Sequence, residues 1–450
     1  MSADTNVTAE ALDRAWAQVR SELAADPLPD PAAAARFAGQ WPQVRARLLA
    51  DLADGRHRPR PFEIAEVPKG GGAHRPVPLL DLADRVVYAA LVGEMAIRID
   101  AALDDHVFSS RLDTQGRRRH SGGREWLRFE GAARVLHRDH GGRALLDTDV
   151  SAFFETLDTT VLAADLAAVG APGGRIERLL DFLTGLTAGS ALRGLPHDQD
   201  ATAILGNLYL APVDRLLRGE GLGFVRYLDD IKVFAPEAGR LHSARQAVED
   251  VLGARGMALA PHKTELREGD AVLAGLTPLG DDPRELFDRA VADGAVRRRE
   301  LRFSLALLGR AGDTHAVPWV AEQVGVMPES ASHFAGYLLA ALPTRPPAAG
   351  LWPAALDKLH ALLAGDAGET MGATGEVHPY TAFHLLRVLT AVPGGDQRTA
   401  PLLHRFADGD AYPGYLRRAA GVARAAARSD AAASSRAVSA PDAPPGRTGC

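Results

Sequence analysis

The stretch Phe224–Phe234 constrains this chain most, because two adjacent carboxylates interrupt a run that is otherwise apolar or alternating. Apolar residues approach Asp229 and Asp230 from one side, and an apolar–polar alternation follows them, a pattern typical of two strands and a tight turn. We therefore expect a β-hairpin with both aspartates at its tip. Neighbouring ionised carboxylates repel each other, so this placement favours a nearby cation. A solvated turn gives the same pattern, because aspartate is common in turns.

Length and composition indicate a globular protein of two or three domains. The chain has 450 residues, of which 46% are apolar and 24% charged. Its only cysteine is Cys450, which excludes disulfides and cysteine-based zinc sites within one chain. We find no apolar run that could cross a bilayer and no secretory pattern at the N-terminus. We therefore expect a cytoplasmic protein without a membrane partner.

Charge is distributed unevenly along the chain. The net charge is −6, yet the segment from Arg111 to Arg143 is rich in arginine. A local basic face on a mildly acidic protein is compatible with a track for a phosphate backbone. A solvated, arginine-rich loop is the alternative interpretation.

A second carboxylate motif lies upstream of the hairpin. The run Ala144–Val150 is typical of a strand, and Asp149 stands near its end, where it could bind a metal ion or cap the following helix. Strand–helix units with an antiparallel hairpin between them predict a split βαβ sheet with helices on one face. In that arrangement Asp149 and Asp229 meet.

A glycine-rich turn precedes both motifs. Residues 62–68 alternate like a strand, and the loop Lys69–His74 and then Arg75 follow. Glycines permit close approach of a ligand, and the two cations would meet its charge, so the turn suits a phosphate clamp. It lacks the Lys-Ser/Thr ending of a P-loop, and glycine-rich hairpin tips are common.

The rest of the chain is mainly helical. Helices are expected within 1–57, at about 81–103, at about 199–217 and over most of 283–428, with a short strand ending at Leu276. The helices after 283 resemble stacked pairs of an α-solenoid, although no repeat consensus is visible. The composition of residues 429–450 predicts disorder.

Together these motifs resemble the reverse transcriptases of the prokaryotic type, a group that includes group II intron, retron and abortive-infection enzymes. The resemblance covers about residues 58–280. It implies an α+β fold of the right-hand polymerase type, followed by an all-α domain with HEAT-like character as one interpretation. The implied domains are an N-terminal helical segment (1–57), fingers (58–143), a palm (144–282), the helical domain (283–428) and a disordered tail (429–450).

The resemblance also implies roles for individual residues. Asp149, Asp229 and Asp230 correspond to the catalytic aspartates, and with the Val150 carbonyl they would hold two Mg²⁺ ions, or Mn²⁺ in their place. Lys263 lies where the family has a lysine near the leaving pyrophosphate, and Leu273–Gly275 resembles the primer grip. The remaining candidates for substrate binding are Lys69, Arg75, Phe154 (which would exclude a 2′-hydroxyl), Gly194, Pro196, His197 and Tyr227.

One motif departs from the family pattern. The usual Gly-x-Pro-Gln-Gly-Ser-Pro-Leu-Ser is replaced by the stretch Gly194–Thr202, in which His197 stands in the place of the glutamine. The stretch resembles the abortive-infection and defence-associated branch more closely, and a helical C-terminal extension fits that branch. Template handling is the property that the change puts in question.

Three functions follow from these patterns. The first is an RNA-directed DNA polymerase acting in phage defence, with an RNA template, a DNA primer, deoxynucleotides and possible further partners in a non-coding RNA or a second copy of the chain. The second is a template-independent nucleotidyl transferase at the same site. The third is an inactive polymerase fold that binds RNA or serves in assembly.

Overall fold

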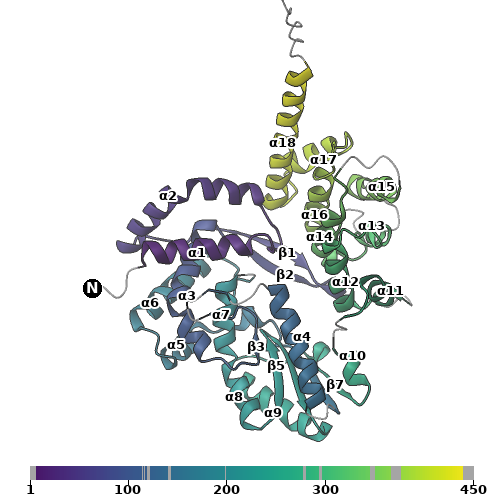
Figure 1. Ribbon diagram of the computed structural model, residues 1–450. Helices are drawn as coiled ribbons and strands as arrows, with labels where there is room; N and C mark the ends of the chain where they lie inside the picture. The colour runs from purple at the N-terminus through teal and green to yellow at the C-terminus, as the bar shows by residue number, and fades with distance from the viewer. Residues whose placement is uncertain are drawn as a thin grey trace, which may run out of the picture. The chain divides into compact units, whose positions relative to one another are not determined.

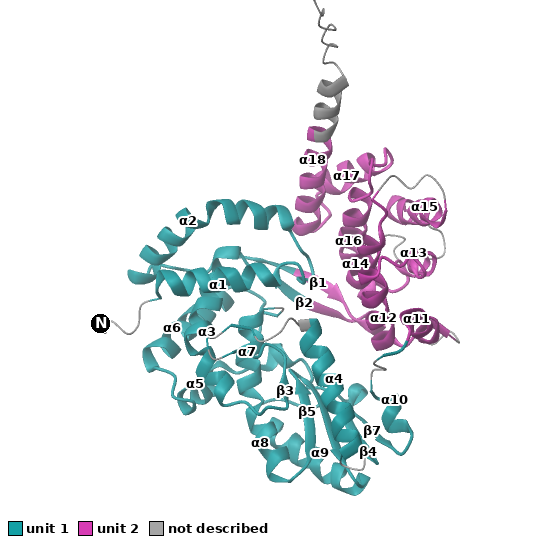
Figure 2. Cartoon of the chain, in the orientation of Figure 1, with its two compact units in different colours: residues 1–64, 76–281 teal, residues 65–75, 282–450 magenta. Residues whose placement is uncertain are grey.

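A computed structural model describes residues 7–113, 115, 117–118, 122–139, 143–197, 199–276, 280–292, 296–344, 350–365 and 377–438 (Figure 1). The chain divides into two compact units (Figure 2). Unit 1 comprises Met1–Ile64 and Pro76–Asp281, and unit 2 comprises Ala65–Arg75 and Asp282–Cys450. The tip of one hairpin therefore groups with the C-terminal helices.

A five-stranded mixed sheet forms the centre of unit 1, with the strand order β3-β5-β6-β4-β7. The pairs β4–β6, β4–β7 and β5–β6 are antiparallel, and β3 pairs with β5 in parallel. The strands are β3 (Val107–Phe108), β4 (Ala144–Thr148), β5 (Gly223–Tyr227), β6 (Asp230–Ala235) and β7 (Glu265–Glu268). Because β6 lies between β4 and β5, the sheet has the split arrangement expected from the sequence.

Both faces of this sheet are buried, so its strands carry apolar residues on both sides. On one face Leu145, Val225 and Phe234 pack with α4 (Gly122–Asp139) in a small cluster. On the other face Leu146 and Val233 join the large core, where α9 (Ala238–Gly253) packs on β4, β6 and β7. Helices therefore cover both faces of the sheet, and the expectation of helices on one face only was wrong, because the sheet buries apolar side chains on both sides.

Of the remaining helices of unit 1, α8 contacts β5 and α10 contacts β7, whereas α1 and α2 lie away from the sheet (Figure 1). The N-terminal helices pack on α3, and α3 packs in turn on α6 and α7. The bounds are α1 (Ala9–Glu22), α2 (Pro31–Ala53), α3 (Leu82–Ala101), α5 (Thr159–Ala168), α6 (Gly173–Thr187), α7 (Asp200–Tyr209), α8 (Ala211–Gly219) and α10 (Ala271–Ala274).

Two expected elements differ in the structure. The helix expected at about 199–217 is two helices, α7 and α8, because the chain turns at Leu210 and Pro212 then occupies the first turn of α8. The strand expected to end at Leu276 is wrong: residues 271–274 form the short helix α10. Leu273–Gly275 is therefore not the primer-grip strand that the resemblance implied.

Unit 2 consists of a helical array and a hairpin tip. Helices α12, α14, α16 and α18 pack successively on one another, as do α13, α15 and α17. The bounds are α11 (Pro283–Val291), α12 (Arg298–Arg310), α13 (Val317–Gln323), α14 (Ala331–Ala341), α15 (Leu351–Ala364), α16 (Pro379–Thr390), α17 (Thr399–Asp408) and α18 (Gly414–Val438). The expected all-helical character is present, and disorder of the tail at 429–450 stays a prediction.

The hairpin whose tip belongs to unit 2 is formed by β1 (Glu63–Pro68) and β2 (His74–Leu79). Its tip is a short 3₁₀ turn at Gly70–Gly72, in which Gly71 and Gly72 have φ values of 80° and 79°. Only glycine adopts such values freely, which explains the glycine run. In the part of the chain that the structure describes, no helix is both long and apolar enough to cross a membrane.

Candidate active site

The two adjacent aspartates lie at the tip of the β5–β6 hairpin, as the sequence predicted. Tyr227 pairs with Asp230, so Leu228 and Asp229 alone make the turn. Leu228 has a φ of 55°, a conformation that costs a non-glycine residue about 1–3 kcal/mol. The Arg226 guanidinium donates to the Leu228 carbonyl at 3.1 Å and so stabilises this turn.

Arg226 itself is fully buried and is one of the residues that sequence reasoning missed. Its guanidinium donates to Asp214 at 2.7 and 2.6 Å, and to the side chain and backbone carbonyl oxygens of Asn207 at 3.0 and 3.1 Å. Together these contacts hold the guanidinium between α7, α8 and the hairpin. An arginine within an apolar strand run is the signal that could have indicated such a buried pair.

Asp149 follows β4 directly and therefore lies near the tip of the β5–β6 hairpin. In the register, Thr148 lies opposite Ile231, which places Asp149 beside the hairpin tip. The Ala260 N–H donates to the Asp149 carbonyl at 2.8 Å, and Val150 forms a bridge with Leu259. This second connection brings the segment before β7 to the site, and with it Lys263.

The charged groups of the site lie close to one another. The Lys263 ammonium donates to the Asp149 carboxylate at 2.6 Å. Burial, together with the charges of Asp149 and Asp230, raises the pKa of Asp229 to about 7. Burial alone would lower the pKa of Lys263, but its hydrogen bond to Asp149 and the three carboxylate charges raise it. The structure therefore brings Asp149, Asp229, Asp230 and Lys263 together, as predicted.

The donor set suits a hard divalent cation. Carboxylate and backbone carbonyl oxygens are the ligands that Mg²⁺ prefers, and Asp149, Asp229, Asp230 and Val150 supply them. The raised pKa of Asp229 comes first from burial and then from the charges of Asp149 and Asp230, and a bound cation would offset both effects. Among the described residues, however, no three such side chains are gathered closely enough to hold a metal ion as they stand. Metal binding therefore stays a prediction.

Phe153 and Phe154 follow Asp149 in a 3₁₀ turn that begins after Ala152, whose φ is 47°. Phe153 is buried, and its ring lies 4.9 Å from that of Phe154. Gly206 of α7 makes room for it, since a Cβ atom there would lie 2.9 Å from the Phe153 ring. The ring of the half-buried Phe154 therefore packs against the buried ring of Phe153, whose position is fixed by the close approach of α7.

The loop that departs from the family pattern packs on the Phe154 segment. Gly194 has a φ of 64°, and a Cβ atom there would lie 2.0 Å from the Phe154 carbonyl oxygen, which accepts from the Leu195 N–H at 2.9 Å. His197 is buried, with its ring 5.3 Å from that of Phe154 and its Nε2 3.5 Å from a Glu155 oxygen. The structure therefore brings Gly194, His197 and Phe154 together.

The end of this loop is tied to distant parts of unit 1 by a charge cluster that the sequence did not reveal. Asp200 pairs with Arg118 at 2.8 Å, and its N–H donates to Glu22 of α1 at 3.3 Å. Burial, followed by the charge of Asp200, raises the pKa of Glu22 to about 8. Thr202 of the loop also donates to the Pro196 carbonyl at 2.7 Å. Asp198 lies outside the described residues.

The remaining candidates lie elsewhere. Tyr227 packs its ring on α4, at 5.2 Å from Trp126 and 5.8 Å from Phe129. Lys69 and Arg75 belong to unit 2, so their expected contact with the substrate stays a prediction. The Arg111–Arg143 segment is partly internal, because Arg111 pairs with the buried Asp100 at 2.7 Å.

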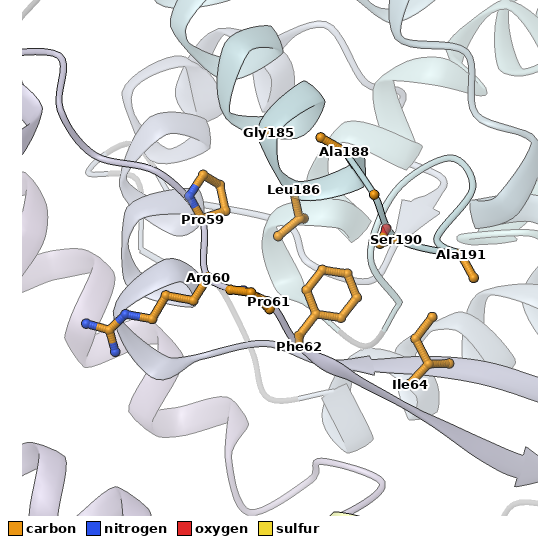
Figure 3. Close-up of a pocket in the computed structure, with 11 residues that line it drawn as sticks. Pro59, Arg60, Pro61, Phe62, Ile64, Gly185, Leu186, Ala188, Ser190 and Ala191 are labelled. Atoms are coloured by element: carbon orange, nitrogen blue, oxygen red, sulfur yellow. The ribbon is translucent and has the colours of Figure 1, made fainter.

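A pocket of about 360 Å³ in unit 1 is separate from these residues (Figure 3). Phe62 and Leu186 contribute apolar side chains to it, and Arg60 extends away from them toward Asp81, which accepts at 2.8 Å. None of the predicted site residues lines it. The described residues that line the pocket include no carboxylate, histidine or lysine.

Most of unit 1 after its N-terminal helices is similar to a known enzyme family. Residues 67–290 match the model of the family described as reverse transcriptase (RNA-dependent DNA polymerase). Residues 67–290 thus match a reverse transcriptase domain. The matched segment contains the three aspartates and Lys263, and the sequence-based assignment to the RNA-directed DNA polymerases is confirmed at this level. No curated protein matches the chain.

Solved structures similar to this chain include two yeast telomerases. One is telomerase from Candida albicans in complex with a fragment of telomeric RNA, at 11% identity and a TM-score of 0.35, covering 82% of this chain and 67% of the other. The second is apo telomerase from Candida tropicalis, at 11% identity and a TM-score of 0.34, covering 82% and 70%.

Proposed function

We propose that the reverse transcriptase domain adds deoxynucleotides to a 3′-hydroxyl by phosphoryl transfer at Asp149 and Asp229. The observation that carries this proposal is the convergence of three carboxylates and Lys263 where the ends of β4 and β5 meet. Two Mg²⁺ ions bound there would activate the attacking oxygen and offset charge on the triphosphate. Asp149, Asp229 and the Val150 carbonyl would hold them, with Asp230 as an additional ligand.

Lys263 would supply a proton to the leaving pyrophosphate. Its raised pKa keeps the ammonium protonated at neutral pH, and 53% of its side chain is exposed, so a substrate oxygen can reach it. The primer 3′-hydroxyl would lose its proton to solvent and its oxygen would bond to the α-phosphorus of the triphosphate. The bond from that phosphorus to pyrophosphate would break, and the Lys263 proton would go to the released pyrophosphate oxygen. Phe154 would contact the sugar and disfavour a 2′-hydroxyl.

The double variant Asp229→Asn/Asp230→Asn tests the assignment. Incorporation of labelled deoxynucleotides on an RNA template should be abolished, whereas Asp105→Asn, at an exposed aspartate of the same unit, should leave it intact. Addition of Mg²⁺ at pH 8 should raise the unfolding temperature of the wild type more than that of the double variant. Full incorporation by the double variant would disprove the assignment.

Template-independent nucleotidyl transfer is the second candidate, favoured by the loop at His197–Asp200. The polar groups of Asp200 and Thr202 are bonded to Glu22, Arg118 and Pro196, within the protein. Because these polar groups already bind other parts of the protein, the loop has fewer hydrogen-bonding groups left to contact a template. An assay with each dNTP and rNTP, with and without RNA, separates the candidates, since complementary product supports the first and homopolymer the second. Absence of product would favour an inactive, RNA-binding or assembly role.

We also propose that the chain belongs to the defence-associated branch of the prokaryotic enzymes. Support comes from the altered loop and from the helical array of α11–α18. We include in this proposal that the array has a HEAT-like arrangement. Expression in a phage-sensitive host should lower the efficiency of plating for at least one phage. The same expression of the Asp229→Asn/Asp230→Asn variant should not, and equal plating with both proteins across a phage panel would contradict the role.

A further inference from the structure

Unit 2 contains a cluster of arginines that its hairpin tip and helix α12 build together. Arg298, at the start of α12, lies directly against Gly70 of the tip, where a Cβ atom would come within 1.8 Å of the guanidinium Nη1. Glycine is therefore required at this position for the guanidinium to remain in place. Glu329 accepts from Arg298 at 2.7 Å and fixes it from the other side.

The positive charge of this cluster exceeds the negative charge around it. Arg302 follows Arg298 by one helical turn, and no described residue forms a hydrogen bond or ion pair with it. Burial lowers the pKa of Arg302, and the charges of Arg298 and Arg75 lower it further, while Glu329 and Tyr380 act in the opposite direction. Like charges gathered at a protein surface favour binding of an anion.

Neighbouring histidines add polar groups without adding charge. Burial, together with the charge of Arg302, lowers the pKa of His333 on α14 to about 4. His74 of the hairpin tip stacks on His378 at 5.3 Å between ring centroids, and burial lowers the pKa of His378 as well. His333 and His378 are therefore neutral at pH 7, and the arginines provide the attraction for an anion.

We propose that Arg298 and Arg302, with Arg75, form a phosphate-binding site in unit 2. Guanidinium groups bind phosphate through paired N–H donors, and the cluster presents them from two segments that are distant in sequence. Helix α12 lies beyond residue 290, where the family match ends, so the site adds residues that the reverse transcriptase domain does not supply. The phosphate comes from a nucleoside triphosphate or from a nucleic-acid backbone, and the two sources can be distinguished.

Binding to the full-length protein, without catalysis, tests the proposal. The probes are inorganic tripolyphosphate, followed by calorimetry, and a fluorescein-labelled single-stranded oligonucleotide, followed by anisotropy at several salt concentrations. Arg302→Gln should weaken binding of at least one probe about tenfold, as loss of a charge-assisted hydrogen bond predicts. Arg310→Gln, which removes an exposed arginine from the end of the same helix, is the matched control and should bind as the wild type does.

Gly70→Ala provides a second perturbation, which leaves every charge in place. The new methyl group would displace the Arg298 guanidinium, so binding should weaken as it does in Arg302→Gln. Arg302→Lys should retain part of the affinity. These three variants keep the test meaningful if one of them folds poorly, which thermal unfolding would reveal.

Each outcome has a definite consequence. Loss of tripolyphosphate binding alone identifies the triphosphate as the source. Weaker oligonucleotide binding, with a salt dependence reduced by about 0.7 in log–log slope, identifies the backbone. Loss of both supports a site that accepts either. Unchanged binding of both probes by Arg302→Gln and Gly70→Ala would overturn the proposal, whether or not the catalytic aspartates prove essential.

Discussion

The crowding of carboxylates at the hairpin tip makes a quantitative prediction about stability. Asp229→Asn removes a carboxyl whose pKa rises from 3.8 to about 7 on folding, because of burial and the charges of Asp149 and Asp230. Between these two pH values the folded chain binds the proton more tightly than the unfolded chain. Stability attributable to Asp229 is therefore greatest at low pH and is lost as the pH rises through about 4 to 7.

The magnitude follows from the pKa difference. A rise from 3.8 to about 7 corresponds to a ceiling of about 4 kcal/mol, at about 1.4 kcal/mol per pH unit. Asp229 retains partial contact with water, and screening reduces this ceiling, so we expect about 2 kcal/mol. In a metal-free buffer Asp229→Asn should accordingly be more stable than the wild type at pH 8 by about this amount, with the difference shrinking toward pH 4.

Urea unfolding of both proteins, at several pH values between 4 and 8 and in the presence of a chelator, measures the difference directly. Asp105→Asn is the control, because it removes an exposed aspartate of the same unit and should show no such trend. A stability difference between wild type and Asp229→Asn that stays constant across this range would refute the electrostatic reasoning. A stability difference that instead grows toward low pH would show that the pKa of Asp229 is lowered on folding, not raised.

Three further substitutions test the packing around the site. Arg226→Met should lower the free energy of unfolding by about 3–5 kcal/mol, because Asp214 would be left charged and buried; urea unfolding measures this, and Asp214→Leu in the same chain should restore part of it. Gly206→Ala should cost about 1–3 kcal/mol and slow nucleotide incorporation, because the Phe153 ring must move; unchanged thermal unfolding would contradict this. Phe154→Ala should raise the ratio of ribonucleotide to deoxynucleotide incorporation in single-turnover assays, and an unchanged ratio would remove Phe154 from sugar selection.

The sequence predicted the parts of the site that depend on local pattern. Alternation around Asp229 and Asp230 located the hairpin, and the apolar run before Asp149 located β4. Once these elements exist, the split arrangement of the sheet brings the carboxylates together. Local pattern was insufficient at Leu210, where the apolar spacing continues across a break, and at 271–274, where four residues suit a helical turn as well as a strand.

Contacts between distant residues could not be predicted in the same way. Glu22 and Asp200 are separated by 178 positions, and nothing near either residue indicates the other. The same holds for Lys232, a buried lysine in β6 that donates to Asp147 at 2.9 Å and to the Gly275 carbonyl at 3.2 Å. A charged residue in an apolar strand signals that a partner must exist, because an unpaired buried charge is too costly, but it does not identify that partner.

The sugar selection proposed for Phe154 would depend on the altered loop, because the loop packs against that residue. Gly194 fits against the Phe154 carbonyl, and the His197 ring contacts the Phe154 ring while its Nε2 lies near Glu155. A change at His197 therefore alters the environment of Phe154 even if neither the histidine nor its partner touches a nucleotide. Substituting glutamine, the residue the family pattern has at this position, would remove one of the two aromatic rings packed against Phe154. If Phe154 selects the sugar as proposed, His197→Gln should therefore change the ratio of ribonucleotide to deoxynucleotide incorporation, and an unchanged ratio would separate the loop from that selection.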